Sequence, residues 1–377
     1  MRRRAFLVLS GGGALAACTA TPYASSPPAV LSASPAASGP AARPVGVLLP
    51  LSGRLADIGQ PMLRAIQLAL SAQGAPRVIS ADTLGTAAGA EGAVRTVLGG
   101  GAGLILGPLT AGETEAVAPI AGAAAIPVLA FTNTATAARP GVWTLGITPP
   151  QQVDRLVGYA VPLGRSRFAA LLPDSEFGNA MARALSEAAT ARGLAAPAVQ
   201  FHGSGGDAVS AALQALTGGG AAPAFNILLL GDTGAALAEV ATALPAAFVA
   251  APAVQLIGPA LWAAPASGSD QVPGGWYAAP DPAARLAFAR AFTAKYAAAP
   301  PGPADLAYDA ASIARVLAPR DYARAALTNA AGFTGVDGWL RLLPDGRVQR
   351  GLAVFQVQAD GARIISPAPT TASAYAA

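Results

Sequence analysis

Polar side chains directly after apolar runs are the residues of this sequence best suited to bind a ligand. The runs 103–106 and 126–131 are apolar, and hydroxyl or amide side chains follow each of them. Open α/β sheets hold ligands beyond the carboxyl ends of their strands, which makes these side chains candidates for a binding cleft. Such residues also cap helices and form turns, so a structural role is the alternative. The candidates are Ser52, Thr110, Thr132, Asn133 and Thr134.

Residue types that carry catalysis or bind metals are scarce. The chain has one histidine, His202, and one cysteine, Cys18, so we expect no metal site. Its one lysine, Lys295, lies outside any Gly-Lys-Ser/Thr phosphate loop, and no Gly-x-Ser-x-Gly elbow occurs. Neighbouring carboxylates are interpreted as solvated faces and helix starts: Glu113 with Glu115, and Asp305 with Asp309. An enzyme is therefore the least supported class, and no cofactor is expected.

The elements that must position the candidate residues follow from the hydrophobic pattern. Apolar strands alternate with helical segments from Val45 to Ile147, and the same rhythm restarts at Gln151 and continues to Gly258. Strands that are apolar at every position require a parallel sheet covered on both faces. We therefore predict an α/β protein of two lobes, each with a parallel sheet between layers of helices.

Composition sets the size of the core and excludes one class of partner. The chain has 377 residues, of which 53% are hydrophobic and 12% charged, which allows a large core and about two domains. Of its 24 basic residues, the three at 2–4 lie in a segment expected to be removed, which leaves 21 against 20 acidic residues. A nearly neutral mature chain does not favour nucleic acid as a partner.

The N-terminus predicts export and a membrane anchor. Residues 1–17 have a basic head and an apolar run too short to span a bilayer, as in a signal peptide. The stretch Leu15–Cys18 resembles the lipobox of bacterial lipoproteins, which implies cleavage before Cys18 and a lipid on its sulfur. The pair Arg3-Arg4 also fits a twin-arginine signal, and the export route stays open. Thr19 implies sorting to the inner leaflet of the outer membrane, within the periplasm.

Two terminal segments lack the composition of a folded domain. Residues 18–43 are mainly Ala, Ser, Pro and Thr and cannot bury enough apolar surface to fold. Proline-rich chain extends by about 3.1 Å per residue, so this segment predicts a tether of roughly 75 Å. Residues 362–377 are predicted to form a disordered tail.

Six stretches share the order and spacing of one known family. They are VLLPLSG (47–53), ADIG (56–59), ILGPLT (105–110), IPV (126–128), DSEFG (174–178) and YDA (308–310). Together they resemble the leucine/isoleucine/valine-binding family of type I periplasmic binding proteins. The resemblance implies two Rossmann-like lobes joined by a three-crossover hinge near Thr148, Ala279 and Thr334, with a ligand held between the lobes. The implied division is 44–148 plus 280–333 for lobe 1, and 149–279 plus 334–361 for lobe 2.

The resemblance also implies which residues would hold an amino acid, and most of them differ here. Where family members have a serine after the Gly-Pro turn and an aromatic hydroxyl across the cleft, this chain has Ala111 and Phe177. The second lobe's tyrosine corresponds to Thr233, and the acid that pairs with the ligand's ammonium corresponds to Ala260. A buried amino acid needs both charges satisfied, so these departures argue against that ligand. Asp232 lies beside the missing groups and either offers a carboxylate or caps the following helix.

Three further stretches narrow the resemblance. They are LTAGETEAVAPIAGAAAIPVLAFTN (109–133), GGWYAAPDP (274–282) and FTGVDG (333–338). With them, the chain most resembles the penicillin-binding protein activator lipoproteins of alphaproteobacteria. The implied role is non-enzymatic, in a lipoprotein that reaches through the periplasm and stimulates a peptidoglycan synthase. The alternative is a solute receptor that delivers an amino acid or related small molecule to the permease of an ABC importer.

Overall fold

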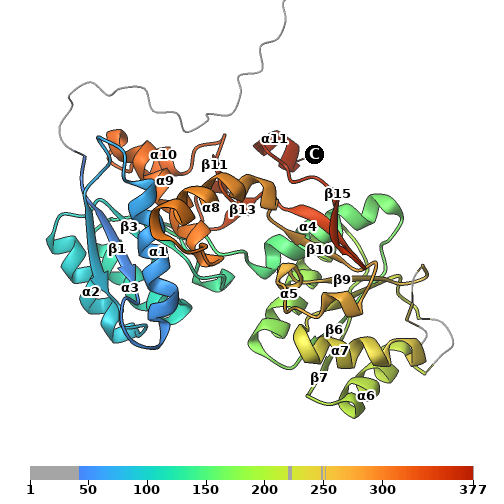
Figure 1. The fold of residues 1–377 in the computed structure, drawn as a ribbon. Helices are drawn as coiled ribbons and strands as arrows, with labels where there is room; N and C mark the ends of the chain where they lie inside the picture. Colours follow the sequence, from blue (N-terminus) through green and yellow to red (C-terminus); the bar gives the residue numbers. More distant parts are fainter. Residues whose placement is uncertain (1–41, 220–222, 248, 251, 377) are drawn as a thin grey trace, which may run out of the picture.

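The computed structural model of the protein describes residues 42–219, 223–247, 249–250 and 252–376. The predicted signal peptide, the lipidation site Cys18 and nearly all of the predicted tether fall outside these residues. Two α/β lobes stand next to each other and are joined by crossings of the chain (Figure 1). The predicted fold class is confirmed. Across the described part, we find no helix with both the length and the apolar character needed to cross a bilayer.

Lobe 1 is built on a five-stranded parallel sheet with the order β2-β1-β3-β4-β5. Helices α1 and α9 cover one face of this sheet, and α2 and α3 cover the other. Helix α8 adds two phenylalanines to the first of these layers. The strands are β1 (Val45–Leu49), β2 (Val78–Asp82), β3 (Leu104–Leu106), β4 (Val128–Ala130) and β5 (Val142–Thr144). The helices are α1 (Ala56–Ala69), α2 (Ala87–Gly99), α3 (Ala111–Ala123), α8 (Pro282–Tyr296), α9 (Pro303–Leu317) and α10 (Arg324–Leu327).

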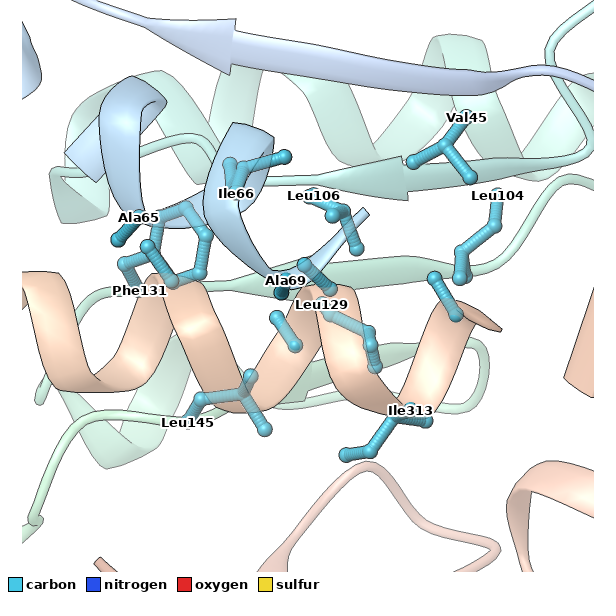
Figure 2. Close-up of a cluster of buried hydrophobic side chains, with 14 of the residues drawn as sticks. Val45, Ala65, Ile66, Ala69, Leu104, Leu106, Leu129, Phe131, Leu145 and Ile313 are labelled. Atoms are coloured by element: carbon cyan, nitrogen blue, oxygen red, sulfur yellow. The ribbon is translucent and has the colours of Figure 1, made fainter. Parts of the chain in front are cut away.

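The core of lobe 1 shows why its strands are apolar at every position. Leu104 and Leu106 of β3 point toward the layer of α1 and α9, where they join Ile66 and Ile313 (Figure 2). Ile105, between them, points to the opposite layer of α2 and α3. Successive side chains of a strand alternate between the two faces, so a sheet covered on both sides needs apolar residues throughout. All five side chains are at most 2% exposed.

The chain enters lobe 1 at the amino edge of the sheet. The hydroxyl of Tyr322 donates to the carbonyl of Arg43 at 2.9 Å, and the guanidinium of Arg43 donates to the carbonyl of Ala102 at 2.9 Å. The N–H of Gly103 donates to the carbonyl of Pro44 at 2.8 Å. These contacts fix the entry point opposite the carboxyl ends of the parallel strands.

Lobe 2 has a seven-stranded mixed sheet with the order β15-β14-β10-β9-β8-β6-β7. Its strands from β10 to β7 are parallel, whereas β14 and β15 add an antiparallel edge. Helices α4 and α5 cover one face, and α6 and α7 cover the other. The strands are β6 (Phe168–Pro173), β7 (Ala198–His202), β8 (Ile227–Leu230), β9 (Gln255–Gly258), β10 (Trp276–Ala279), β14 (Ala353–Gln358) and β15 (Gly361–Ser366). The helices are α4 (Pro149–Ala160), α5 (Glu176–Ala191), α6 (Gly206–Thr217) and α7 (Gly234–Ala243).

A small antiparallel sheet, here named the hairpin sheet, follows α10 in the sequence and precedes the third crossing of the chain. It consists of β11 (Phe333–Gly335), β12 (Gly338–Leu342) and β13 (Val348–Arg350). Leu340, Leu342 and Val348 belong to the core of lobe 1, and the indole N–H of Trp143 donates to the carbonyl of Leu343 at 2.7 Å. The hairpin sheet therefore packs on lobe 1, and the chain crosses to lobe 2 at 351–352. The predicted third crossing near Thr334 came too early, because the apolar face of this sheet is buried against β5.

The C-terminal segment also differs from its prediction. Residues expected to form a disordered tail instead make β15 (Gly361–Ser366), which pairs with β14, and α11 (Ala372–Ala376). The ring of Tyr375 in α11 lies 5.5 Å from the ring of Trp339 in the hairpin sheet. A strand on the edge of a sheet is stabilised by pairing with its neighbour as well as by burial of apolar side chains. Amino-acid composition gives no information about that pairing. Figure 1 shows α11 between the hairpin sheet and β15.

Candidate functional site

A groove of about 1220 Å³ lies between the two lobes. Lobe 1 contributes the amino end of α3 and the loop after β4, and lobe 2 contributes the amino end of α4 and one face of α5. The turn between β12 and β13 and the ring of Tyr375 line its hinge side. The groove therefore lies where the carboxyl ends of β3 and β4 face the second lobe, as open α/β sheets place their ligands.

The structure brings some of the predicted cleft residues to this groove. Ala111, Asn133 and Thr134 line it from lobe 1, and Phe177 lines it from the first turn of α5 in lobe 2. The remaining candidates do not line the groove: Ser52, Thr110, Thr132, Asp232 and Thr233.

Thr110 caps helix α3. Its hydroxyl accepts a hydrogen bond from the N–H of Glu113 at 3.3 Å, and the Glu113 carboxylate accepts one from the N–H of Thr110 at 2.8 Å. This reciprocal pair is a capping box. Glu113 is 1% exposed and also accepts from the hydroxyl of Thr83. Glu113 thus lies at a helix start, as predicted, but it is buried there and not on a solvated face.

Thr110→Ala is expected to lower the free energy of unfolding by about 1 kcal/mol, because the first turn of α3 loses an acceptor. Urea denaturation measures the loss, and Thr110→Ser, which keeps the hydroxyl, should remain close to the wild type. Equal stability of the alanine variant and the wild type would contradict the capping role.

Ser52 and Thr132 form turns at the ends of their strands. The hydroxyl of Ser52 donates to the carboxylate of Asp82 at 2.6 Å, and Asp82 accepts two backbone N–H groups as well. Thr132 is 5% exposed, and its hydroxyl accepts from the N–H of Thr134 at 3.1 Å. Both side chains therefore have the structural role that was the alternative to ligand contact.

Asp232 pairs with the one histidine of the chain. Its carboxylate lies 3.1 Å from Nε2 of His202, and both side chains are 4% exposed. The indole of Trp262 donates to the backbone carbonyl of Asp232 at 3.0 Å. The pair joins the ends of β7 and β8 beside a pocket of about 280 Å³ within lobe 2. Asp232 therefore does not cap α7, whose N-cap residue is Thr233.

The surroundings of His202 favour its charged form. Nε2 faces the carboxylate of Asp232, and Nδ1 faces the carbonyl of Gly203 at 2.9 Å, whereas a neutral imidazole donates only once. The hydrogen bond to Asp232 raises the pKa of His202 above 6.5, against the opposite effect of burial, and the Gly203 carbonyl and Glu239 raise it further. A raised pKa in the folded state gives stability that is complete below pH 6.5 and is lost as the pH rises through the folded value.

His202→Ala is expected to lower the free energy of unfolding by about 2 kcal/mol at pH 6, because Asp232 loses its buried partner. The difference from the wild type should be smaller at pH 9, where His202 is neutral. Urea denaturation at both pH values measures it, with Asn133→Ala in the exposed groove as the control. A loss of the same size at both pH values would rule out a charged pair.

The position that corresponds to the family's ammonium-binding acid, Ala260, makes a hydrogen bond within the protein. The N–H of Ala260 donates to the side-chain oxygen of Gln152 at 2.7 Å, and the amide nitrogen of Gln152 donates to the carbonyl of Ile147 at 3.2 Å. Gln152 is 4% exposed. These bonds tie the first crossing of the chain, between β5 and α4, to the loop after β9.

The sequence prediction missed the longest wall of the groove, which is one face of α5. Charged and amide side chains recur there every three or four residues with alanines between them, as on one face of a helix. The face carries Glu176, Asn179, Ala180, Arg183, Ala184, Glu187 and Ala188. The sequence of α5 does show the period of an amphipathic helix. A polar face that lies against solvent and one that faces a second lobe have the same sequence pattern, so the period does not show which of the two is present.

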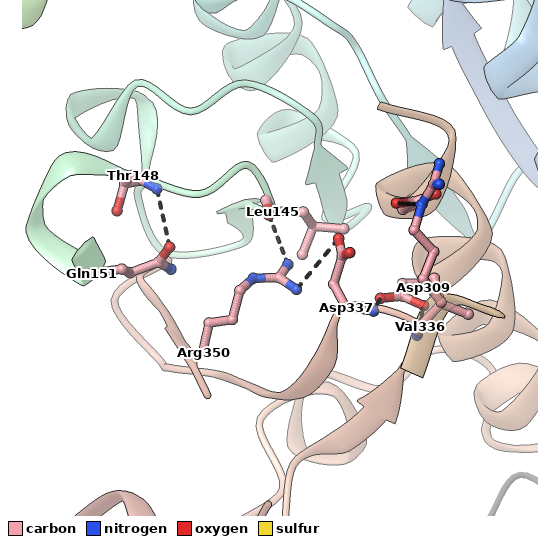
Figure 3. A network of polar contacts seen from close by, with 9 residues as sticks. Leu145, Thr148, Gln151, Asp309, Val336, Asp337 and Arg350 are labelled. Atoms are coloured by element: carbon pink, nitrogen blue, oxygen red, sulfur yellow. Dashed lines mark hydrogen bonds and ion pairs between the residues drawn. The ribbon is translucent and has the colours of Figure 1, made fainter. Parts of the chain in front are cut away.

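A buried polar network connects the first and third crossings (Figure 3). Arg350 is 2% exposed, donates to the carbonyl of Leu145 at 2.8 Å, and lies 3.9 Å from the carboxylate of Asp337. Gln151 donates to the carbonyl of Val348 at 2.6 Å and accepts from the N–H of Thr148 at 3.0 Å. A side chain of the first crossing therefore bonds to the backbone of the third, and a side chain of the third bonds to the backbone of the first.

The acids next to this network are buried, and their interpretation as solvated helix faces is wrong. The Asp309 carboxylate accepts from the N–H groups of Val336 at 2.7 Å and Asp337 at 3.3 Å. Burial, with the nearby Asp337, raises the pKa of Asp309 to about 7. Burial also raises the pKa of Asp305 to about 6, although the hydrogen bond from Arg285 lowers it. Among the described residues, no group of three or more His, Cys, Asp or Glu side chains could hold a metal ion.

Comparisons with solved structures place the fold among known binding proteins. A branched-chain amino acid ABC transporter protein from Rhodospirillum rubrum has 22% identity and a TM-score of 0.72, covering 86% of this chain and 100% of that one. A periplasmic ligand-binding protein of a branched-chain amino acid ABC transporter from Burkholderia xenovorans has 18% identity and a TM-score of 0.70, covering 89% and 97%.

A third structure is that of LpoA from Haemophilus influenzae. It has 16% identity and a TM-score of 0.67, and the match covers 86% of this chain but 59% of LpoA. No curated protein sequence matches the chain. The family model described as periplasmic binding protein matches residues 44–362, which include both lobes and the hairpin sheet. The chain therefore belongs to the periplasmic binding protein family.

Proposed function

We propose that the protein is a non-enzymatic, lipid-anchored protein of the periplasm that activates a penicillin-binding protein, a synthase of peptidoglycan. The observation that carries the proposal is the chemistry of the cleft between the lobes. Asp232 is engaged by His202 inside lobe 2, the N–H of Ala260 is bound to Gln152, and Phe177 offers a ring without a hydroxyl. A small zwitterion enclosed there would have an uncompensated ammonium, which costs several kcal/mol.

The charges that do line the groove are exposed. Glu115, Glu176 and Glu187 line the groove from α3 and α5 and are exposed, so water screens their interaction with a small ligand. Exposed charges beside alanines suit a protein surface better than a closed ligand site, since the rims of protein interfaces are polar and solvated. The sequence resemblance to activator lipoproteins supports the same role.

The second candidate is a receptor for an ABC importer. Asn133 and Thr134 line the groove at the end of β4, where a carboxylate could accept hydrogen bonds from them. The proteins from Rhodospirillum rubrum and Burkholderia xenovorans, both described with branched-chain amino acid ABC transporters, share the fold.

One experiment separates the two candidates. The purified protein is added to a purified penicillin-binding protein from the same organism, and the rate of glycan polymerisation is followed. We expect a faster rate, and no rise in melting temperature when amino acids are added to the protein alone. An amino acid that raises the melting temperature, with the rise abolished in Thr134→Ala but retained in Thr96→Ala on the far helix α2, would establish the receptor instead.

A further inference from the structure

The C-terminal segment 367–376, here named the strap, passes from lobe 2 to the hairpin sheet of lobe 1. It begins directly after β15, which is paired with β14 in the lobe 2 sheet. It ends at α11, where Tyr375 contacts Trp339. Trp339 is 2% exposed, and its indole donates to the carbonyl of Ala331 at 2.8 Å, so its ring is fixed in the hairpin sheet. The strap is thus a further connection between the lobes beside the three crossings.

One residue of lobe 2 holds both the start of the strap and the third crossing. Arg155 of α4 donates to the hydroxyl of Ser366 at 2.6 Å and to the carbonyl of Pro367 at 3.1 Å. Its Nε donates to the carbonyl of Leu352 at 2.8 Å. A guanidinium that donates in several directions fixes the relative position of the groups it bonds. The start of the strap is therefore fastened beside the third crossing by a residue of lobe 2.

The middle of the strap lies tightly against the third crossing. At Gly351, a Cβ would come within 2.1 Å of the carbonyl oxygen of Pro369, so the two backbones touch. Further along, the hydroxyl of Thr371 accepts from the N–H of Ala374 at 3.1 Å and starts the turn into α11. The segment therefore follows the hinge closely up to the point where Tyr375 reaches the hairpin sheet.

Tyr375 also lines the groove. It does so beside Asp154 of lobe 2 and Arg347 of the hairpin sheet, at the hinge side. A change of the angle between the lobes moves Asp154 relative to Arg347, because these residues belong to different lobes. Tyr375 belongs to a segment that Arg155 fastens to lobe 2, so the same movement shifts the tyrosine relative to Trp339 of the hairpin sheet.

From these contacts we infer that the strap is a restraint on hinge motion: docked on Trp339, Tyr375 holds the lobes at one angle, and its release lets them move. A single aromatic pair changes an equilibrium constant by roughly two- to tenfold, enough to set a preference and weak enough to be reversed by a partner. The inference does not depend on which partner or ligand the groove takes, because it concerns the angle between the lobes in the protein alone.

The test measures the distance between the lobes directly. Spin labels are attached at Ala88→Cys on α2 and Ala215→Cys on α6, both exposed positions, in the full chain carrying Cys18→Ser. Double electron–electron resonance then gives the distribution of distances. We expect one narrow distribution for the labelled parent and a distribution about twofold wider for Tyr375→Ala.

Two further variants complete the design. Tyr375→Phe keeps the ring against Trp339 and should give the narrow distribution of the parent. A chain ending at Ser366 lacks the whole strap and should be at least as broad as Tyr375→Ala, and it tests the inference even if the alanine variant fails to fold. Parent-like distributions for both Tyr375→Ala and the shortened chain would overturn the inference.

Discussion

Arg350→Met is expected to destabilise the protein by about 3 kcal/mol, because removing one partner of a buried ion pair leaves the other without compensation. Arg350 is 2% exposed, and the only carboxylate within 4 Å of its guanidinium in the described chain is that of Asp337. The variant also deprives the carbonyl of Leu145 of its donor. Methionine fills a similar volume with an apolar side chain, so packing changes less than charge does.

A double-mutant cycle separates the contribution of the ion pair from the other effects of replacing Arg350. Asp337→Asn in the Arg350→Met background removes the orphaned charge, so the double variant should lose less stability than the two single losses added together. Urea denaturation gives the free energy of unfolding of the wild type, the two single variants and the double variant. Arg95→Met, at an exposed pair with Glu91, is the control and should cost about 0.5 kcal/mol or less. Strictly additive losses for Arg350 and Asp337 would show that the two side chains do not interact.

Asp309→Ala is the second substitution with a large expected effect. Its carboxylate accepts two backbone N–H groups of the turn between β11 and β12, and the alanine variant leaves both without a partner at a 2% exposed site. A loss of about 3 kcal/mol is expected, since each unsatisfied buried donor costs roughly 1–3 kcal/mol. Asp309→Asn keeps an acceptor oxygen and should lose less. The fit is close: a Cβ at Gly335 would lie 2.2 Å from Oδ2 of Asp309.

The same residue makes stability depend on pH in a defined direction. The pKa of Asp309 is raised from 3.8 to about 7 in the folded protein, so the folded state retains a proton that the unfolded chain has already lost. The contribution of this proton to the free energy of unfolding is therefore complete below pH 3.8 and is lost as the pH rises through 7. The wild type should lose more stability than Asp309→Asn between pH 5 and pH 8, measured by urea denaturation. A wild type that gains stability relative to the asparagine variant over that range would contradict the raised pKa.

The apolar strands made the two-lobed fold predictable from the sequence. Residues such as Leu104–Leu106 are apolar at every position, and a sheet covered on both faces imposes that pattern directly. The hairpin sheet was harder to place. Leu340 and Leu342 alternate like any half-buried strand, and the sequence does not show that they join the core of lobe 1. Nor does it show that Trp143 donates to the carbonyl of Leu343, two hundred residues away.

The sequence predicted where the candidate site lies, but not which of its polar side chains bond to one another. Asn133 and Phe177 reach the groove because they follow strand ends, which periodicity locates. Asp232 follows β8 and pairs with His202, which lies 30 residues earlier at the end of β7, on the other side of β6 in the sheet. A carboxylate looks the same in sequence whether it is free or paired. The strap was missed for a related reason, since alanine, serine and proline give no signal of the contacts made by Arg155 and Trp339.

The chain enters lobe 1 on the side opposite the groove. Arg43 is held at the amino edge of the sheet, whereas the groove opens beside the carboxyl ends of β3 and β4. A connection that arrives at this point therefore leaves the groove unobstructed. The connection also reaches lobe 1 alone, so it leaves lobe 2 free to turn about the hinge.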